Sequence, residues 1–224
     1  MSDSERTAGT EPGVGTEGPH RVTYGPYRAK RMVDLAVLLV VSVPALVIGG
    51  LCAAGVKLTS RGPVFFMQER VGMGGTAFSV FKFRTMVDAP NPIFPDPERI
   101  TLAGRILRRL SLDEVPQLIN VLRGEMSVVG PRPTLAYQVE RYDDRQRHRL
   151  DVRPGLTGLA QIRGRNALAW ADHIEHDLEY VQTQSLALDL AILLATARVV
   201  LSGEGIEGHP TDDSLAGTDV TSEG

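Results

Sequence analysis

The sequence of 224 residues contains few cysteines and aromatic residues, and its last 22 residues contain no lysine or arginine. It contains one cysteine, Cys52, so no intrachain disulfide can form and nothing indicates an oxidising compartment. Aromatic residues make up 5% of the chain and are not interleaved with its basic patches, which argues against binding of nucleic acid by base stacking. Lysine and arginine are absent from residues 203–224. These shortages exclude a disulfide-stabilised domain and a stacking platform as the basis of function.

Charge is distributed unevenly along the chain. Residues 1–20 carry a net charge of −3 and residues 203–224 carry −6, so residues 21–202 carry +6 in a chain whose total is −3. Both ends are also rich in Gly, Ser and Thr and poor in apolar residues, which predicts disordered tails over residues 1–27 and 203–224. The remainder suits one domain of ordinary size, with a basic character that favours anionic partners such as phosphates.

A long apolar run from Met32 to Leu58 predicts a membrane segment over residues 28–58. About 20 apolar residues cross a bilayer, and the run is too long for a signal peptide and lacks a clear cleavage site. Ser42 and Pro44 lie near its middle, where the proline favours a kink or a break. Basic residues flank both ends, which suits a helix-break-helix that returns to one side; a kinked span is the alternative, and the residues do not decide between them.

The rest of the chain predicts one small β-ribbon followed by helices. Two strand-like segments flank the glycine-rich turn Val71–Gly75. An amphipathic helix is expected next, with a charged helix and two further helices after it. The segments are Val64–Met67 and Phe78–Phe83 for the strands, and Ile100–Leu110, 134–150, Ala167–Gln182 and Leu186–Leu201 for the helices.

Two adjacent carboxylates, Asp113 and Glu114, follow a run of arginines. Ser111-x-x-Glu114 fits a helix capping box, and Pro116 predicts that the turn is distorted or that the helix starts again there. The same position is an electropositive helix entrance, where phosphate also binds, so capping and phosphate chemistry both remain open. Prolines on both sides of Arg132 fix the backbone around one guanidinium, which favours recognition of an oxyanion.

A possible metal site lies further along the chain. His173 and His176 have metal-ligand spacing, but no third ligand completes a site there.

Six ordered motifs between about Tyr27 and Gly205 resemble those of the small monotopic phosphoglycosyl transferases. These are bacterial membrane enzymes that begin glycan assembly on a polyprenyl-phosphate carrier. The chain departs from some relatives in that Val43 separates Ser42 from Pro44, and in a short, proline-rich loop over residues 87–98. The motifs are Lys30–Asp34, Gln68–Gly72, Phe81–Met86, Ser111–Asn120, Gly130–Pro133 and Arg153–Asn166.

The resemblance implies an α+β fold in three parts. A re-entrant membrane helix-break-helix over residues 28–58 would bend at Ser42 and Pro44. A mostly helical catalytic domain with a small β-ribbon would occupy residues 59–202. Both ends of the membrane segment would be cytoplasmic, which places the catalytic domain on the cytoplasmic face of the bacterial inner membrane.

The resemblance also implies transfer of a sugar 1-phosphate from a UDP-sugar to polyprenyl phosphate, with Asp113 as the nucleophile and UMP as the leaving group. Mg²⁺ would be held by Asp113 and Glu114, and Glu114 could instead hold the acceptor phosphate. No nucleic acid partner is expected. Two other functions are weighed: a membrane-anchored scaffold in which the acid pair is only a cap, and a metal-dependent phosphohydrolase. The phosphate sites would be lined by Lys82, Arg84, Arg132 and Arg165.

Overall fold

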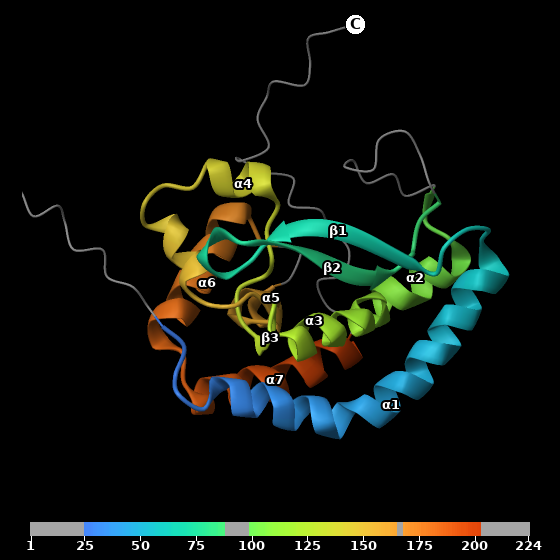
Figure 1. Cartoon of the computed structure of the whole chain (residues 1–224), viewed down its shortest axis with the longest axis horizontal. Helices are drawn as coiled ribbons and strands as arrows, with labels where there is room; N and C mark the ends of the chain where they lie inside the picture. The colour runs from blue at the N-terminus through green and yellow to red at the C-terminus, as the bar shows by residue number, and fades with distance from the viewer. Residues whose placement is uncertain (1–24, 88–98, 165–167, 203–224) are drawn as a thin grey trace, which may run out of the picture.

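One helix, α1 (Lys30–Thr59), carries the whole apolar run in the computed structural model, which describes residues 25–87, 99–164 and 168–202. Figure 1 shows α1 bending near its middle. Pro44 lies inside the helix and cannot donate to the preceding turn, and the Ser42 hydroxyl bonds to the Leu39 carbonyl at 3.0 Å. The expected break between two helices is therefore a bend within one continuous helix.

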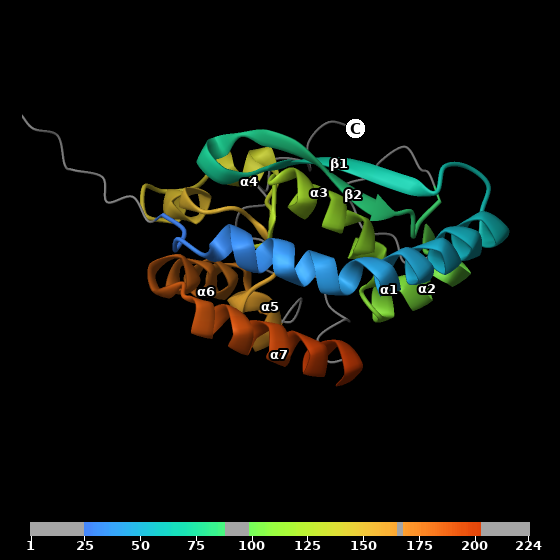
Figure 2. The ribbon, with the colours of Figure 1, turned by 60° about the horizontal axis from the view of Figure 1, so that its bottom comes forward.

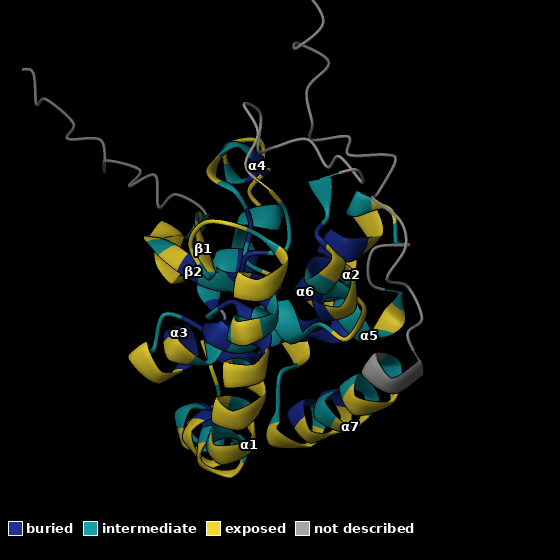
Figure 3. Ribbon diagram, turned by 90° about the vertical axis from the view of Figure 1, so that its right-hand side faces the viewer, coloured by how far each residue is buried: buried dark blue, intermediate teal, exposed yellow. Residues whose placement is uncertain are grey.

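Helix α1 is long and apolar enough to cross a membrane, and its apolar side chains are mostly exposed. Only Lys30, Asp34, Cys52 and Val56 are buried within it. A core helix of a soluble protein would hide its large apolar side chains, whereas Figure 3 shows α1 largely as exposed surface. The exposure and composition of α1 are compatible with a membrane-anchored domain. The most exposed side chains are Met32, Leu39, Val40, Val43, Leu46, Leu51 and Leu58.

The predicted ribbon is confirmed as an antiparallel hairpin of β1 (Phe65–Val71) and β2 (Ala77–Phe83). A short 3₁₀ turn, η1 (Met73–Gly75), joins the strands, and Gly74 and Gly75 adopt φ values of 68° and 82° there. Those angles favour glycine because it has no Cβ. Residues with even numbers on both strands share one face of the hairpin, since Arg70 pairs with Phe78 and Gln68 with Val80.

Helix α3 lies between the ribbon and α1, and α2 packs against α1 (Figures 1 and 2). Thr101 caps α2 by accepting a hydrogen bond from the Gly104 N–H at 2.9 Å. The helices predicted over 100–110, 167–182 and 186–201 are confirmed as α2, α6 and α7. The bounds are α2 Leu102–Arg109, η3 Leu112–Gln117, α3 Leu118–Arg123, α4 Ala136–Glu140, η4 Gln146–Asp151, α5 Leu159–Arg163, α6 Trp170–Thr183 and α7 Leu186–Ser202.

The single helix predicted over residues 134–150 is wrong. The segment forms α4, which has only five residues, and the 3₁₀ helix η4. Between them Asp143 and Gln146 form a local turn: the Asp143 carboxylate accepts from the Gln146 N–H at 2.7 Å, and the Gln146 side chain accepts from the Asp143 N–H at 3.1 Å. These side-chain bonds offer the backbone an alternative to a continuous helix.

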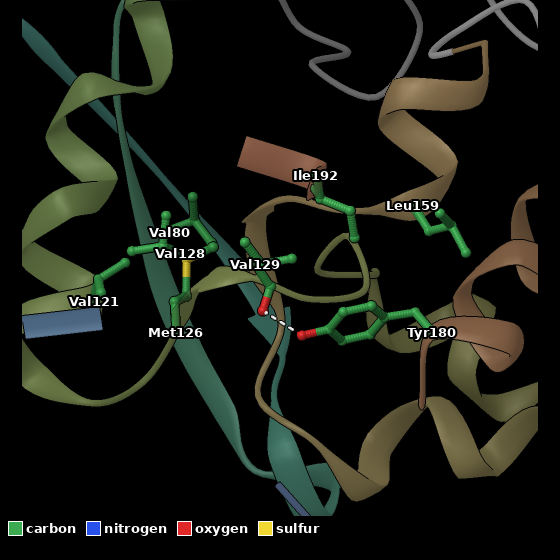
Figure 4. Close-up of a cluster of buried hydrophobic side chains, with 8 residues drawn as sticks. All are labelled: Val80, Val121, Met126, Val128, Val129, Leu159, Tyr180 and Ile192. Atoms are coloured by element: carbon green, nitrogen blue, oxygen red, sulfur yellow. Dashed lines mark hydrogen bonds between the residues drawn. The ribbon is translucent and has the colours of Figure 1, made fainter. Parts of the chain in front are cut away.

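A second sheet, absent from the sequence-based expectation, forms the centre of the domain. β3 (Ser127–Val129) and β4 (Gly155–Thr157) pair in parallel. A Cβ on Gly155 would lie 2.1 Å from the Gly130 nitrogen, so glycine is required for this close approach. Figure 4 shows the core around β3, where the Tyr180 hydroxyl of α6 donates to the Val129 carbonyl at 3.2 Å. The cluster comprises Val80, Val121, Met126, Val128, Val129, Leu159, Tyr180 and Ile192.

Buried charges join the start of α1 to this core. The Lys30 ammonium donates to the Val129 carbonyl at 2.7 Å and to Asp189 of α7 at 2.5 Å. Asp34 accepts from the Ser127 hydroxyl at 2.7 Å and the Val128 N–H at 2.9 Å. Each buried charge thus has a partner, which offsets the cost of removing it from water. The Lys30–Asp34 motif fixes the start of α1 to the domain, and Asp189 of α7 is the partner of Lys30.

Candidate active site

A sharp turn presents the acid pair at the start of η3. Ser111 adopts the left-handed conformation (φ 56°), and its side chain makes no capping hydrogen bond. The predicted capping box is therefore wrong, and the Glu114 N–H instead donates to the Ser111 carbonyl at 3.3 Å. The predicted distortion at Pro116 is confirmed, because the chain is a 3₁₀ helix until α3 begins at Leu118.

Two basic residues from distant segments meet at Glu114. The Lys82 ammonium of β2 donates to Glu114 Oε1 at 2.7 Å, and the Arg132 guanidinium, from the loop after β3, donates to the same oxygen at 3.2 Å. The side chains of Lys82 and Glu114 are each 20% exposed, so the charges interact in a partly desolvated site. The structure thus brings together Glu114, Lys82 and Arg132, three of the residues predicted from the sequence.

The two carboxyls have different protonation behaviour. Burial alone would raise the pKa of Glu114, but the charges and hydrogen bonds of Lys82 and Arg132 lower it to about 2. The pKa of Asp113 is raised, first by burial and then by the charge of Glu114, against the opposing charges of Lys82, Arg108 and Arg132. Glu114 therefore loses its proton more readily than Asp113, whose environment favours the neutral form.

A small hollow opens beside Glu114, and Arg70 of β1 contributes to it. Arg70 donates to the Pro133 carbonyl at 3.2 Å and to the Gln68 side chain at 2.7 Å. Burial and the neighbouring charge of Arg132 lower the pKa of Arg70 to about 10. Such concentrated positive charge favours an anion of high charge density. The lining residues are Arg70, Val80, Lys82, Glu114, Gln117, Arg132, Pro133, Gly155 and Leu156.

Sequence reasoning missed Arg70 and Arg108 as site residues. Arg70 could have been found from the hairpin, because the glycine turn fixes a register in which Arg70 shares a face with Val80 and Lys82. Arg108 is the last but one residue of α2, and its charge lowers the pKa of Asp113. In the sequence it stands only as one of the arginines that precede the acid pair.

Other predicted residues lie elsewhere. Arg84 donates to the Arg61 carbonyl at 2.6 Å and to the Ser60 hydroxyl at 2.8 Å, so it holds the end of α1 and does not join Glu114. Arg165 lies outside the described residues. Ser42 and Pro44 are both within α1.

The carboxylates of the site suit a metal that completes its coordination with substrate. Mg²⁺ is bound through one or two carboxylates together with waters and substrate phosphates, and Asp113 and Glu114 offer two adjacent carboxylates. No group of three or more His, Cys, Asp and Glu side chains that could hold a metal occurs in the described ranges. His176 instead lies beside Arg163 and Glu179. The acid pair could supply two of the ligands of a Mg²⁺ ion, and His173 with His176 forms no such cluster in the described ranges.

Comparisons with known proteins give a consistent result. A family model described as "Bacterial sugar transferase" matches residues 26–203. The chain is 44% identical to the "Uncharacterized sugar transferase EpsL" of Bacillus subtilis, over 86% of this chain and 98% of that protein. It is 40% identical to the "Exopolysaccharide production protein ExoY" of Rhizobium meliloti, over 79% and 87% of the two chains. It is 42% identical to the "UDP-glucose:undecaprenyl-phosphate glucose-1-phosphate transferase" of Caulobacter vibrioides, over 77% and 70%.

Proposed function

The chain belongs to the bacterial sugar transferase family, and from this premise we propose that it transfers a sugar 1-phosphate from a UDP-sugar to undecaprenyl phosphate. The products are polyprenyl-diphosphate sugar and UMP, and the enzyme is a polyprenyl-phosphate phosphoglycosyl transferase. Relatives named for this reaction and for exopolysaccharide production support the assignment. The observation that carries it is the acid pair of η3 lying against Lys82 and Arg132 beside an exposed apolar helix.

We propose that the reaction proceeds in two steps through Asp113. In the first step, an Asp113 carboxylate oxygen attacks the phosphorus that bears the sugar. The bond between this phosphorus and the oxygen that bridges the two phosphates breaks, and UMP leaves with the electron pair. In the second, a phosphate oxygen of the lipid attacks the same phosphorus and Asp113 leaves as a carboxylate. No base is needed to activate Asp113 once it is ionised. The opposite shifts of the two pKa values, lowered for Glu114 and raised for Asp113, support different roles for the two carboxyls.

Lys82, Arg132 and Arg70 bind the phosphate oxygens in this proposal. Phosphoryl transfer depends mostly on positioning and on stabilising charge at the oxygens, which fixed cations in a partly dry site provide. Mg²⁺, held by Asp113 and Glu114 when bound, would offset the diphosphate charge. Glu114 keeps Lys82 and Arg132 in place through the hydrogen bonds to its Oε1. The phosphate roles of Arg84 and Arg165 remain predictions.

We also propose that α1 enters the inner membrane and returns to the cytoplasmic face, with residues 28–58 as the membrane segment and 59–202 as the catalytic domain. Basic residues at both ends of α1, Arg28 and Arg61, support two cytoplasmic ends. The bend in α1 provides a turning point within one leaflet. The proposed tails, residues 1–27 and 203–224, lie almost wholly outside the described residues.

Cysteine labelling tests this topology. In a Cys52→Ala background, Arg28→Cys and Arg61→Cys each place one thiol at an exposed position flanking the membrane segment. A maleimide that does not cross membranes is expected to label both in inside-out vesicles and neither in intact spheroplasts. Labelling of one position from each side would establish a kinked span and refute the re-entrant arrangement.

The function is tested with the purified full chain, a panel of labelled UDP-sugars and Mg²⁺. Release of UMP and transfer of label to lipid are expected when undecaprenyl phosphate is present. Release of soluble sugar phosphate without any lipid product would favour the phosphohydrolase. No turnover of any UDP-sugar would contradict the proposed reaction and favour a membrane-anchored scaffold protein.

The pH dependence of kcat/KM is expected to have an acid limb that reports ionisation of Asp113. Because the pKa of Asp113 is raised, activity falls as the pH drops through a value above the ordinary range for aspartate. Lys82→Met removes a positive charge that lowers this pKa, so the limb moves to higher pH, by about one unit. Lys57→Met, at an exposed lysine near the end of α1, should leave the limb in place. A limb that stays fixed in Lys82→Met would contradict the assignment to Asp113.

A further inference from the structure

Four successive backbone carbonyls in the loop that carries Arg132 each accept a hydrogen bond from a different residue. Prolines on both sides of Arg132 cannot donate from their nitrogens, so the loop is held through its carbonyl groups. Backbone donors hold its two ends and arginine side chains hold its middle. The bonds are Gly155 N–H to Pro131 at 2.8 Å, Arg149 Nη2 to Arg132 at 3.3 Å, Arg70 Nη1 to Pro133 at 3.2 Å and Val71 N–H to Thr134 at 2.9 Å.

The donor to the Arg132 carbonyl, Arg149 of η4, belongs to a buried ion pair with Asp177 of α6. Their side chains are 3% and 0% exposed. Arg149 also donates to the Tyr142 hydroxyl, and its guanidinium lies 5.5 Å from the centre of the Tyr142 ring and 5.8 Å from that of Trp170. Asp177 and Trp170 belong to α6, Tyr142 follows α4, and the Arg132 carbonyl belongs to the loop after β3, so Arg149 contacts three separate segments.

A buried ion pair is a poor source of stability, because the cost of removing two charges from water can exceed their attraction. The Arg149–Asp177 pair also contacts the Arg132 carbonyl, through Arg149, and can therefore affect the position of Arg132. Arg149 holds the backbone carbonyl of Arg132, and the side chain of the same residue reaches Glu114 Oε1 at 3.2 Å. A shift of the carbonyl would carry the guanidinium with it, because both belong to one residue between two prolines.

We propose that Arg149, oriented by Asp177, is a positioning residue that sets Arg132 at the phosphate site. The inference rests on the proposed phosphosugar transfer. Asp177 orients Arg149, and Arg149 holds the backbone of Arg132. Arg132 in turn contacts Glu114 and the donor diphosphate. Neither Arg149 nor Asp177 touches substrate. Their effect on the rate passes through Arg132.

The test removes the ion pair as a unit. Arg149→Met with Asp177→Leu replaces both charges by apolar side chains of similar size, which avoids leaving one charge unpaired in the core. Arg149→Lys is the second variant; it keeps a cation beside Asp177 but loses the fork that spans Asp177, Tyr142 and Arg132. The matched control is Arg145→Gln with Glu175→Gln, which removes an ion pair that also joins the η4 region to α6 but is exposed and does not contact the loop.

UMP release is then measured in each variant, alone and combined with Arg132→Met. Misplaced catalytic groups lower kcat, so we expect kcat to fall roughly 10- to 30-fold in the apolar double variant with a smaller change in KM for the UDP-sugar. In the Arg132→Met background the same change should cost less than about twofold, because the residue it acts through is gone. The control should stay within about twofold of the parent.

The outcomes separate the inference from the function on which it rests. The inference is overturned if the apolar double variant and Arg149→Lys each lower kcat by the same factor with and without Arg132→Met. Arg149 would then have a purely structural role, and the proposed function would be unaffected. If the apolar variant does not fold, the same cycle with Arg149→Lys decides. A parent enzyme that releases no UMP with any sugar would overturn the proposed function itself.

Discussion

Asp113→Asn is expected to abolish formation of the lipid-linked sugar phosphate, with kcat reduced on the order of 10⁴-fold or more. Removal of a nucleophile that forms a covalent intermediate eliminates the reaction path, and such losses in other enzymes are among the largest that single substitutions cause. Asparagine keeps the size and shape of the side chain but carries no negative charge. The loss would therefore follow from the missing carboxylate rather than from altered packing.

Stability should not fall with activity in Asp113→Asn. The pKa of Asp113 is raised, by burial first and by Glu114 second, which means that the folded protein disfavours its charged form. By linkage, a carboxyl with a raised pKa makes the folded state less stable at neutral pH, so the uncharged asparagine costs nothing and relieves repulsion from Glu114. An unchanged or higher melting temperature, together with lost activity, is typical of a functional residue and not of a helix cap.

The measurement combines turnover with trapping of the intermediate. Parent protein quenched in acid after brief exposure to labelled UDP-sugar should retain label on Asp113, and Asp113→Asn should retain none. Asp172→Asn, at an exposed aspartate in the first turn of α6, is the matched control and should behave as the parent. Full turnover by Asp113→Asn, or equal label on both proteins, would refute the covalent step.

Local patterns in the sequence predicted the elements that depend on local forces. Alternation around a glycine turn predicted the β1–β2 hairpin, and helical periodicity predicted α2, α6 and α7. The sheet of β3 and β4 was missed, because three-residue strands show no period and the residues that pair lie 28 positions apart. The helix expected over 134–150 does not form because of local bonds that its periodicity does not reveal. The side chains of Asp143 and Gln146 bond to each other's backbone N–H groups and interrupt the helix.

The site was predictable where residue type alone carries the chemistry. Asp113 and Glu114 were identified as adjacent acids at a helix entrance and Arg132 as an arginine held between two prolines, whereas the role of Lys82 followed only from the resemblance to the family. Glu114, Lys82 and Arg132 meet in the structure. The residues that orient them were not identified from the sequence. Arg149 and Asp177 lie 28 positions apart in charged segments that resemble solvated surface, and only tertiary packing reveals that both are buried.

Replacement of Glu114 by glutamine has the second largest effect, an expected loss in kcat on the order of 10² to 10³-fold. Glutamine can still accept the hydrogen bonds from Lys82 and Arg132, but it cannot balance their charges. The pKa of Arg132 is raised chiefly by the charge of Glu114, which indicates how strongly the two attract each other. Without that charge the two cations repel, and their fixed positions around the phosphate are lost.

Separate measurement of the two half-reactions decides what Glu114 does. If it orients Lys82 and Arg132, both UMP release in a single turnover and discharge of the phosphosugar to lipid should slow, because the same cations bind phosphate in each step. If Glu114 holds mainly Mg²⁺, high Mg²⁺ should restore much of the rate; if it holds the acceptor, only the second step should slow. Glu140→Gln, at an exposed residue of α4, controls for the change of charge. Rates near those of the parent in both half-reactions would show that the charge of Glu114 does not organise the site.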